Sequence, residues 1–264
     1  MRCFPARRLV CLTEETVETL YLLGEQNRIV GVSGYAVRPP QVRHEKPRVS
    51  AFTSADIPKV EALKPDLVLA FSDIQASIAA DLARAGLAVH IFNQRDLAGI
   101  FAMIRTLGAL IGCNEKADAL ANSFVKRIEN IRNETRGLVR RPRVYFEEWD
   151  DPLITGLCWV SELIEIAGGE DIFPEKRSKP AAKDRIVTAA EVAKRSPDII
   201  LASWCGKRVR PEKIRGRDGW QDVPAVSKNR IHEIKSPLIL QPGPAALTDG
   251  LDAIRTAIGS TSVL

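Results

Sequence analysis

Residues that usually carry catalysis or hold metals are scarce in this 264-residue chain. There are three histidines, and the five cysteines form no CxxC pair of the kind found in zinc sites. The nucleophile elbow, the Walker loop and the glycine-rich dinucleotide fingerprint are all absent. The sequence therefore gives no strong support for an enzyme, and we expect neither catalytic residues nor a metal site.

Long apolar runs and a strong charge of one sign are also missing. The best candidate for a membrane span, residues 97–112, is interrupted by Arg105 and is shorter than the roughly 18 residues needed. The formal net charge is +5, and its one basic run, residues 206–217, is more typical of a solvated loop than of an anion site. We expect neither a membrane span nor a nucleic-acid partner.

One phrase occurs twice, at residues 63–70 and again at residues 195–202. The first copy reads LKPDLVLA and the second RSPDIILA. In each, a Pro-Asp pair follows a helical pattern and precedes an apolar run typical of a parallel strand buried on both faces. The repeat predicts two similar α/β lobes. In each lobe the chain leaves the sheet after this strand and enters a loop, at the sheet edge where open α/β folds bind ligands.

The remaining pattern agrees with this division. In the first lobe we expect strands at residues 9–12, 29–33, 48–52, 67–71 and 89–92 and helices at residues 14–23, 57–63, 74–85 and 97–111. In the second we expect strands at residues 143–147, 199–203 and 230–234 and helices at residues 160–167, 189–195 and 246–258, with proline-rich loops elsewhere. Residues 114–136 contain no Pro or Gly and place apolar side chains three and four apart, which predicts a helix of roughly 35 Å.

These elements predict an α/β fold of two Rossmann-like lobes with parallel sheets. The N-terminal lobe covers residues 1–112 and the C-terminal lobe residues 140–264. One long backbone helix within residues 113–139 joins them, and we expect a ligand cleft between the lobes.

Aromatic residues are few, with eight Phe, four Trp and three Tyr, yet several fall where predicted strands end. These are Tyr35, Phe52, Phe71, Trp149 and Trp204. Such side chains bind flat apolar ligands, although packing between the lobes explains their positions equally well. The positions favour a binding protein.

Acidic residues offer an alternative. Carboxylate pairs at residues 147–148 and 150–151 flank Trp149, and such pairs can perform acid–base catalysis, although solvated loop carboxylates are more common. We therefore keep open an enzyme or metal-handling protein that surrounds a metal or metal complex with Glu14, Glu15, Glu148, Asp150 and Cys205.

Several phrases together resemble a known family. They are LLG at residues 22–24 with RIVGV at 28–32, Tyr35 and Pro39, VEALKPDLV at 60–68, the long helix, Gly168-Gly169, and RSPD at 195–198. From about Arg8 to Ile258 the chain resembles the periplasmic-type substrate-binding proteins with a helical backbone, which serve ABC importers of vitamin B12, haem and iron–siderophores. The vitamin B12-binding branch is the most similar.

The resemblance implies a non-enzymatic protein without a cofactor, which binds a corrinoid such as cobalamin or a related metal chelate. Its aromatic positions align with Tyr35, Phe52 and Phe71, and its second-lobe contacts fall near residues 153–156 and 182–185. Loops 204–207 and 236–244 should border the site. The expected ligand-binding residues are Tyr35, Phe52, Phe71, Asp73, Trp149, Arg185, Trp204, Cys205 and Gln241. An iron–siderophore or haem binding protein of an importer is the alternative.

Family members that feed a permease carry an exposed glutamate on each lobe. The aligned positions here are Pro58 and Ala190, with Glu61 and Glu191 nearby. The first strand also begins too early to leave room for a secretory leader. These features, with five unpaired cysteines, predict a cytoplasmic relative that does not deliver its ligand to an ABC permease. A displaced docking pair is the alternative, as is a periplasmic protein whose leader was removed.

Overall fold

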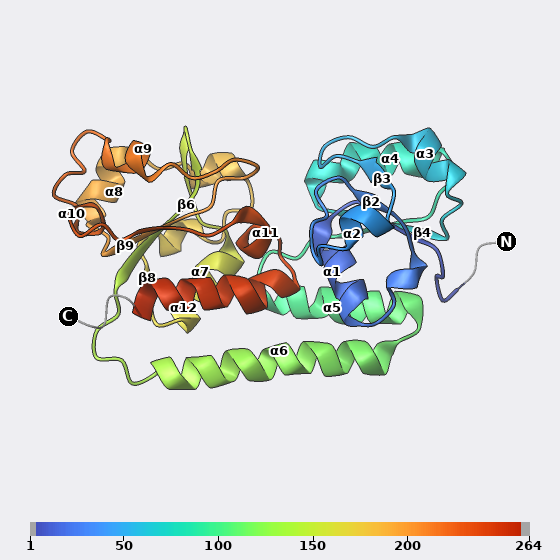
Figure 1. Cartoon of the computed structure of the whole chain (residues 1–264), viewed down its shortest axis with the longest axis horizontal. Coiled ribbons are helices and arrows are strands. Elements are labelled where there is room, and N and C mark those ends of the chain that lie inside the picture. The colour runs from blue at the N-terminus through green and yellow to red at the C-terminus, as the bar shows by residue number, and fades with distance from the viewer. Residues whose placement is uncertain (1–3, 260–264) are drawn as a thin grey trace. The chain divides into compact units, whose positions relative to one another are not determined.

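The computed structural model describes residues 4–259, and it divides the chain into two compact units, residues 1–125 and 126–264 (Figure 1). Helix α6, Asn114–Thr135, is one uninterrupted helix of 22 residues that contains the boundary between the units. No helix among the described residues is long and apolar enough to cross a membrane.

The first unit is built on a five-stranded parallel sheet in the order β3-β2-β1-β4-β5. Its strands are β1 (Leu9–Cys11), β2 (Ile29–Ser33), β3 (Arg48–Ser50), β4 (Leu67–Phe71) and β5 (Val89–Phe92). Its helices are α1 (Glu14–Leu22), α2 (Val42–Glu45), α3 (Ile57–Ala62), α4 (Ala76–Arg84) and α5 (Leu97–Ile111), with 3-10 turns at Gln26–Arg28 and Asp73–Gln75. Apolar runs in β1 and β4 are buried, as expected for strands covered on both faces.

The second unit contains a sheet in the order β10-β9-β6-β7, and β8 pairs with β6 beside it. Its strands are β6 (Arg143–Asp150), β7 (Leu153–Thr155), β8 (Glu170–Asp171), β9 (Ile199–Ala202) and β10 (Ile231–Glu233). All pairings are parallel except that of β7 with β6. Its helices are α7 (Cys158–Ile166), α8 (Ala189–Arg195), α9 (Pro211–Arg215), α10 (Pro224–Ser227), α11 (Ser236–Ile239) and α12 (Leu251–Gly259).

Several segments differ from the sequence-based expectation. Three short helices, α9, α10 and α11, occupy stretches expected to be proline-rich loops, and each has its proline at the first or second helical position, where no N–H is needed. The expected helix 246–258 begins as a π-helix, Ala246–Gly250, before α12. Strand β6 continues to Asp150, so the carboxylates at residues 147–150 belong to a strand and not to a loop.

The repeated phrase forms the same turn in both units. Lys64 follows α3 and Ser196 follows α8, and both adopt left-handed backbone angles, with φ of 48° and 47°. A following proline disfavours the right-handed helical conformation in the residue before it, so each helix ends there. Each turn then leads directly into a buried strand, β4 or β9.

The aspartate after each proline fixes the neighbouring central strand. Oδ2 of Asp66 accepts hydrogen bonds from the backbone N–H groups of Arg7 and Arg8, both at 2.9 Å. Oδ2 of Asp198 accepts one from the N–H of Arg143, also at 2.9 Å. In both units the aspartate N–H returns a bond of 2.8 Å to the carbonyl of the same arginine, Arg8 or Arg143. The carboxylates therefore fix where β1 and β6 begin relative to β4 and β9.

The substitution Asp198→Ala removes the acceptor of the Arg143 N–H group. We expect the free energy of unfolding of the second unit to fall by about 1–2 kcal/mol, the cost of leaving a partly buried donor unpaired. All four tryptophans lie beyond residue 126, so their fluorescence during urea denaturation follows this unit alone. Asp222 is exposed, and Asp222→Ala should change the value by less than ~0.5 kcal/mol. Equal losses in the two variants would contradict the role of Asp198.

Candidate functional site

The strand order of the first unit places its topological switch point beside β1. The chain adds β2 and β3 on one side of β1 and then crosses to add β4 on the other. In open parallel sheets, ligands bind at the carboxyl ends of the strands where the order reverses. In this unit those ends lead to Thr13 and Glu14 after β1 and to Ser72 and Asp73 after β4.

Gln75 holds the strand ends of this edge together. Its side chain is fully buried, and its Nε2 donates to the carbonyls of Phe52 at 2.9 Å and Leu12 at 3.3 Å. Its Oε1 accepts a 3.0 Å bond from the N–H of Phe71. One amide therefore links the segments that follow β1 and β3 to the end of β4. Nothing in the local sequence pattern distinguishes this glutamine, and sequence reasoning missed it.

Ser72 adopts a backbone conformation that is rare for any residue but glycine. Its φ is 59° and its ψ is 178°, and it lies between Phe71 and Asp73 at the switch point. Such conformations cost of order 1–3 kcal/mol and concentrate at functional sites. Two hydrogen bonds hold it there, from Ser72 N–H to the carbonyl of Phe92 and from the N–H of Ile74 to Ser72 Oγ.

The four expected site residues of the first unit lie at or just after carboxyl ends of strands, with different exposures. Tyr35 is half exposed, Phe52 is partly buried and Phe71 is only 6% exposed. Asp73 is exposed, and its Oδ1 accepts a 2.9 Å bond from Arg95. The Arg95 guanidinium also lies 5.3 Å from the centre of the Phe71 ring. Tyr35 therefore offers the largest aromatic surface of this edge, whereas Phe71 is largely covered.

Two carboxyl groups are buried at the start of α1. Glu14 is 9% exposed and Glu15 only 1% exposed. Burial, followed by the proximity of Glu15 and then Glu18, raises the pKa of Glu14 to about 8. Burial also raises the pKa of Glu15 to about 7, although a hydrogen bond from Thr13 Oγ1 to its Oε1 opposes the shift. Both groups hold a proton far more readily than an exposed glutamate.

The second unit has its switch point between β6 and β9, because β7 lies on one side of β6 and β9 on the other. Glu147 of β6 is fully buried there. It accepts bonds of 2.5 and 2.8 Å from Arg217 and one of 3.0 Å from Nε1 of Trp204. Burial opposes the positive charge of Arg217, but the hydrogen bonds to Glu147 outweigh it and raise the arginine pKa.

The other carboxylates of β6 also have cationic partners. Arg185 is 2% exposed, pairs with Glu148, and donates to the carbonyl of Thr155 at 2.5 Å. Asp150 pairs with Lys207, and although burial opposes the shift, this contact lowers the pKa of Asp150. The Lys207 ammonium also lies 3.7 Å from the centre of the Trp149 ring.

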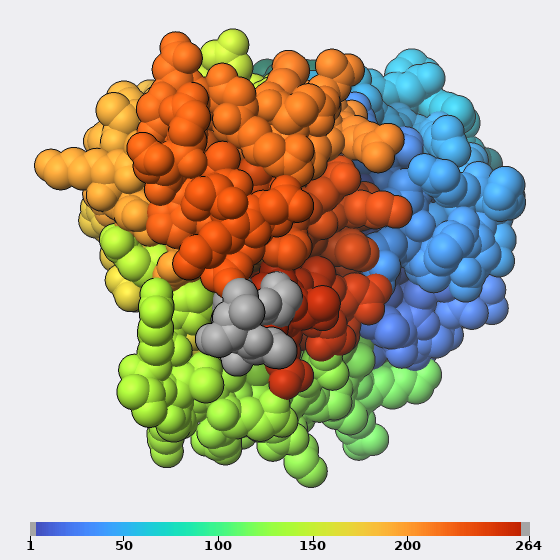
Figure 2. Space-filling model, turned by 60° about the vertical axis from the view of Figure 1, so that its left-hand side comes forward, coloured from blue at the N-terminus to red at the C-terminus, as the bar shows by residue number. Residues whose placement is uncertain are grey.

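The basic run is therefore an anchored surface segment. Its end is fixed by Arg217 on Glu147, and its middle by the N–H of Val209, which donates to Glu233 at 3.1 Å. The orange part of Figure 2 contains this segment together with α9 and α10, and it lies on the molecular surface.

Trp204 differs most from its expected role. It is 2% exposed and packs in a core cluster with Tyr145, Trp220 and other buried side chains, so it has almost no surface to offer a ligand. This corrects its assignment as an apolar wall of the site. Cys205, next in the chain, is exposed, and Gln241 is partly buried. Trp149 is the partly exposed aromatic residue of this edge.

The alternative metal site receives no support from the geometry. Glu14 and Glu15 lie in the first unit, whereas the other three proposed residues lie in the second. Glu148 and Asp150 are each occupied by a cation. Among the described residues, no three His, Cys, Asp or Glu side chains are grouped so that they could hold a metal ion.

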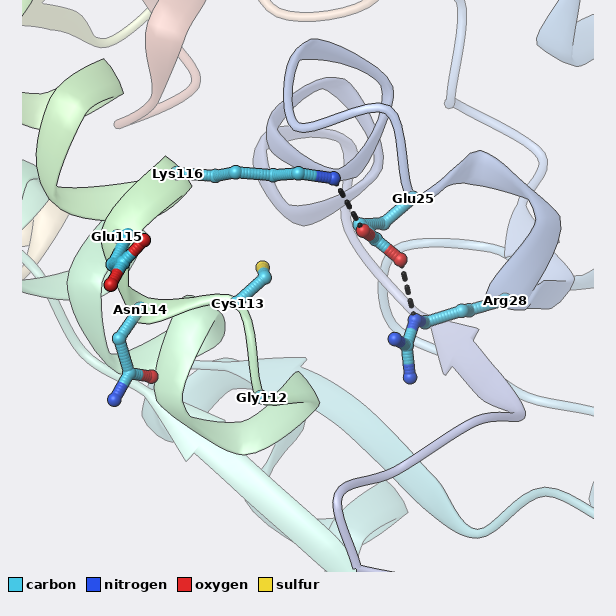
Figure 3. Close-up of a pocket in the computed structure, with 7 residues that line it drawn as sticks. All are labelled: Glu25, Arg28, Gly112, Cys113, Asn114, Glu115 and Lys116. Carbon is cyan, nitrogen blue, oxygen red and sulfur yellow. Dashed lines mark hydrogen bonds and ion pairs between the residues drawn. The ribbon is translucent and has the colours of Figure 1, made fainter.

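A separate hollow of about 440 Å³ lies in the first unit between the 3-10 turn before β2 and the start of α6 (Figure 3). Glu25 bridges Lys116 at 3.0 Å and Arg28 at 2.7 Å across it. The turn precedes β2, so this hollow lies at the amino ends of the strands, away from the switch point. Glu25, Arg28 and Lys116 are already paired with one another there, and the hollow gives no indication of a ligand.

The positions aligned with docking glutamates are equivalent in the two units. Pro58 and Ala190 are each the second residue of a helix, α3 and α8, that leads into the repeated turn. Glu61 is exposed on α3. Glu191 forms a capping box with Thr188, so its carboxylate already binds the start of its own helix.

The buried ion pair of Glu147 and Arg217 generates a stability prediction. Arg217→Met leaves the Glu147 carboxylate buried and unpaired, which should cost about 3–5 kcal/mol of unfolding free energy. The double variant Glu147→Gln, Arg217→Met removes that charge and should recover most of the loss. Arg208→Met, at an exposed site, is the matched control. A loss in the double variant as large as in Arg217→Met would contradict this account of the pair. Tryptophan fluorescence during urea denaturation measures the unfolding free energy of the wild type and of the three variants.

Comparison with known proteins agrees with this architecture. Residues 9–238 match the family described as "Periplasmic binding protein". A Bacillus subtilis relative named "Uncharacterized ABC transporter substrate-binding lipoprotein YvrC" is 27% identical over 96% of this chain and 80% of its own length. A Vibrio campbellii "Vitamin B12-binding protein" is 26% identical over 90% of this chain and 84% of its own.

Solved structures share the fold. The periplasmic vitamin B12 binding protein BtuF of Vibrio cholerae superposes with a TM-score of 0.78 at 24% identity, covering 98% of this chain and 99% of its own. The periplasmic heme-binding protein RhuT from Roseiflexus gives 0.80 at 22% identity, covering 96% and 99%. The chain therefore belongs to the periplasmic binding protein family, and it is a binding protein and not an enzyme.

Proposed function

We propose that the chain binds a corrinoid of the vitamin B12 type at the carboxyl edges of its sheets. The observation that carries the proposal is the set of partly exposed apolar side chains at these edges. Tyr35 is 52% and Ile74 51% exposed in the first unit, and Ile186 is 39% exposed in the second, where Trp149 is also partly exposed. A large, flat ligand would cover such surface.

The comparisons support a corrinoid as the first ligand to test. The Vibrio campbellii relative, 26% identical over most of both chains, is named a vitamin B12-binding protein. Structures that share the fold include heme-binding proteins, so haem is the main competitor. The expected alternative of an iron–siderophore is tested in the same way.

The permease partner of the chain and its cellular compartment stay predictions. One relative is named a lipoprotein of an ABC transporter, so delivery to a permease is consistent with the family. The chain lacks glutamates at the two aligned docking positions, Pro58 and Ala190, and Glu191 is engaged in its own helix cap. We therefore infer that docking on a permease, if it occurs, uses other residues. The cytoplasmic location expected from the sequence stays a prediction.

Titration with cyanocobalamin, haemin and a ferric catecholate siderophore tests the proposal. We expect cyanocobalamin to bind in a one-to-one complex by isothermal titration calorimetry and to quench tryptophan fluorescence, because the partly exposed Trp149 lies at the carboxyl end of β6. Haemin or the siderophore should bind more weakly. Tighter binding of either competitor, or no binding of cyanocobalamin, would overturn the assignment.

Tyr35→Ala should weaken cyanocobalamin binding about 10- to 150-fold, which corresponds to about 1.5–3 kcal/mol for a large apolar side chain buried by the ligand. Leu22→Ala is the matched control. Leu22 is 51% exposed, close to the 52% of Tyr35, but it ends α1 at the opposite edge of the sheet. Similar affinities in wild type and Tyr35→Ala would remove Tyr35 from the site.

A further inference from the structure

Glu14 is a buried carboxyl group without a polar partner. Only 9% of the residue is exposed, and among the described residues no hydrogen bond or ion pair reaches its carboxyl oxygens. Its neighbour Glu15 is covered further, since its Oε2 is shut off from solvent and has no hydrogen-bond partner, whereas the oxygens of Glu14 still reach solvent. Buried polar groups in native structures are almost always satisfied, so a largely buried carboxyl group that no described side chain of the protein satisfies requires an explanation.

The position of Glu14 suggests where its partner comes from. It is the first residue of α1 and follows the carboxyl end of β1, the central strand at the switch point. The strained Ser72 and the side chain of Gln75 lie at the same strand edge. The unsatisfied carboxyl group is therefore located where this fold class receives ligands.

The charged groups around α1 do not neutralise Glu14. Glu15 and Glu18 of the same helix both favour its protonated form. Arg38, on the loop after β2, pairs with Glu18 at 2.9 Å. Arg105 of α5 is engaged with Asp118 and Asn122.

Two further neighbours of α1, Cys11 and Lys46, do not neutralise Glu14 either. The thiol of Cys11 on β1 is neutral, because burial raises its pKa to about 12. Lys46, which follows α2, acts on Cys11 rather than on Glu14. Glu14 is thus poised to hold its proton near neutral pH and to act as a hydrogen-bond donor as well as an acceptor.

We propose that the carboxyl group of Glu14 is a recognition site for a primary amide of the ligand. A protonated carboxyl and a primary amide form two hydrogen bonds at once, O–H to the amide carbonyl and N–H to the carboxyl carbonyl. Corrinoids carry primary amides around their ring, so this inference rests on the proposed function and adds a specificity element to it. A ligand that placed an ionised carboxylate here would bring it next to the acidic group of Glu14.

The pairing makes affinity depend on pH with a defined sign. Below pH 8 the carboxyl holds its proton and both hydrogen bonds form. As the pH rises through this value the proton is lost, the O–H donor disappears, and affinity falls. The free protein loses stability over a lower pH range, as the pH rises from about 4.5 to about 8, because over this range the unfolded chain has ionised Glu14 while the folded protein still holds the proton.

Cyanocobalamin affinity measured from pH 6 to pH 9.5 tests the proposal. In the wild type, the dissociation constant should be constant below pH 7 and rise about tenfold by pH 9.5, as expected for the loss of one hydrogen bond to a buried group. Glu14→Gln presents an amide that makes the same two bonds and does not titrate. It should bind within about threefold of the wild-type affinity at pH 6.5, with a flat profile.

Two further variants complete the set. Glu14→Ala should bind about tenfold more weakly than the wild type at pH 6.5, again with a flat profile. Glu61→Gln, at an exposed site on α3, should reproduce the wild-type profile. A flat wild-type profile, or a pH dependence that persists in Glu14→Gln, would overturn the proposal while leaving corrinoid binding intact. Absence of cyanocobalamin binding at every pH would overturn the proposed function, and this inference with it.

A calorimetric measurement on the wild type makes the test independent of any variant's folding. Titrations at pH 8 in buffers of different ionisation enthalpy report the number of protons exchanged. With the Glu14 pKa at about 8, binding should take up roughly half a proton at this pH. No uptake, or release of protons, would count against Glu14 as the donor.

Discussion

The fold depends on hydrogen bonds that one aspartate carboxylate in each unit accepts from backbone N–H groups at the start of the central strand. Asp66 fixes β1 next to β4, and Asp198 fixes β6 next to β9. Parallel strands have no hairpin to set their register, so a side chain that binds the backbone of the neighbouring strand supplies it. Because register is set at the amino ends, the carboxyl ends align at the other edge, where both switch points lie.

The two units treat buried charge at these edges in opposite ways. In the second unit, each carboxylate among Glu147, Glu148 and Asp150 has a cation within contact. Removing a partner from such a pair is costly, so this edge is fixed in one arrangement. In the first unit, Glu14 and Glu15 have no cationic partner among the described residues, and burial raises their pKa values to about 8 and about 7. One edge pairs its acids with cations, and the other does not.

The sequence predicted the two α/β units but not the direction in which their aromatic side chains point. The apolar runs and the Pro-Asp repeat led to the two-unit α/β architecture, since both reflect local chemistry. The distribution of Trp, Phe and Tyr pointed to the ends of strands but not to which rings face solvent. Trp204 is covered because its indole N–H donates to Glu147, distant in sequence, and its ring packs in a core cluster with Tyr145 and Trp220. Gln75 was missed because its role consists of contacts to strand ends up to 63 residues away.

The unsatisfied acids of the first unit give the edge a means of discrimination that apolar surface lacks. Tyr35 and Ile74 would accept any flat ring system, because dispersion and apolar burial do not distinguish a corrin from a porphyrin. A buried hydrogen-bonding group rejects a ligand that leaves it unpaired far more strongly than an apolar wall rejects a wrong shape. Carboxylates on a ligand would have to lose their solvation beside Glu14, whereas amides would satisfy it. The selectivity of this edge therefore depends on the protonation of an acid that forms no ion pair with any of the described residues.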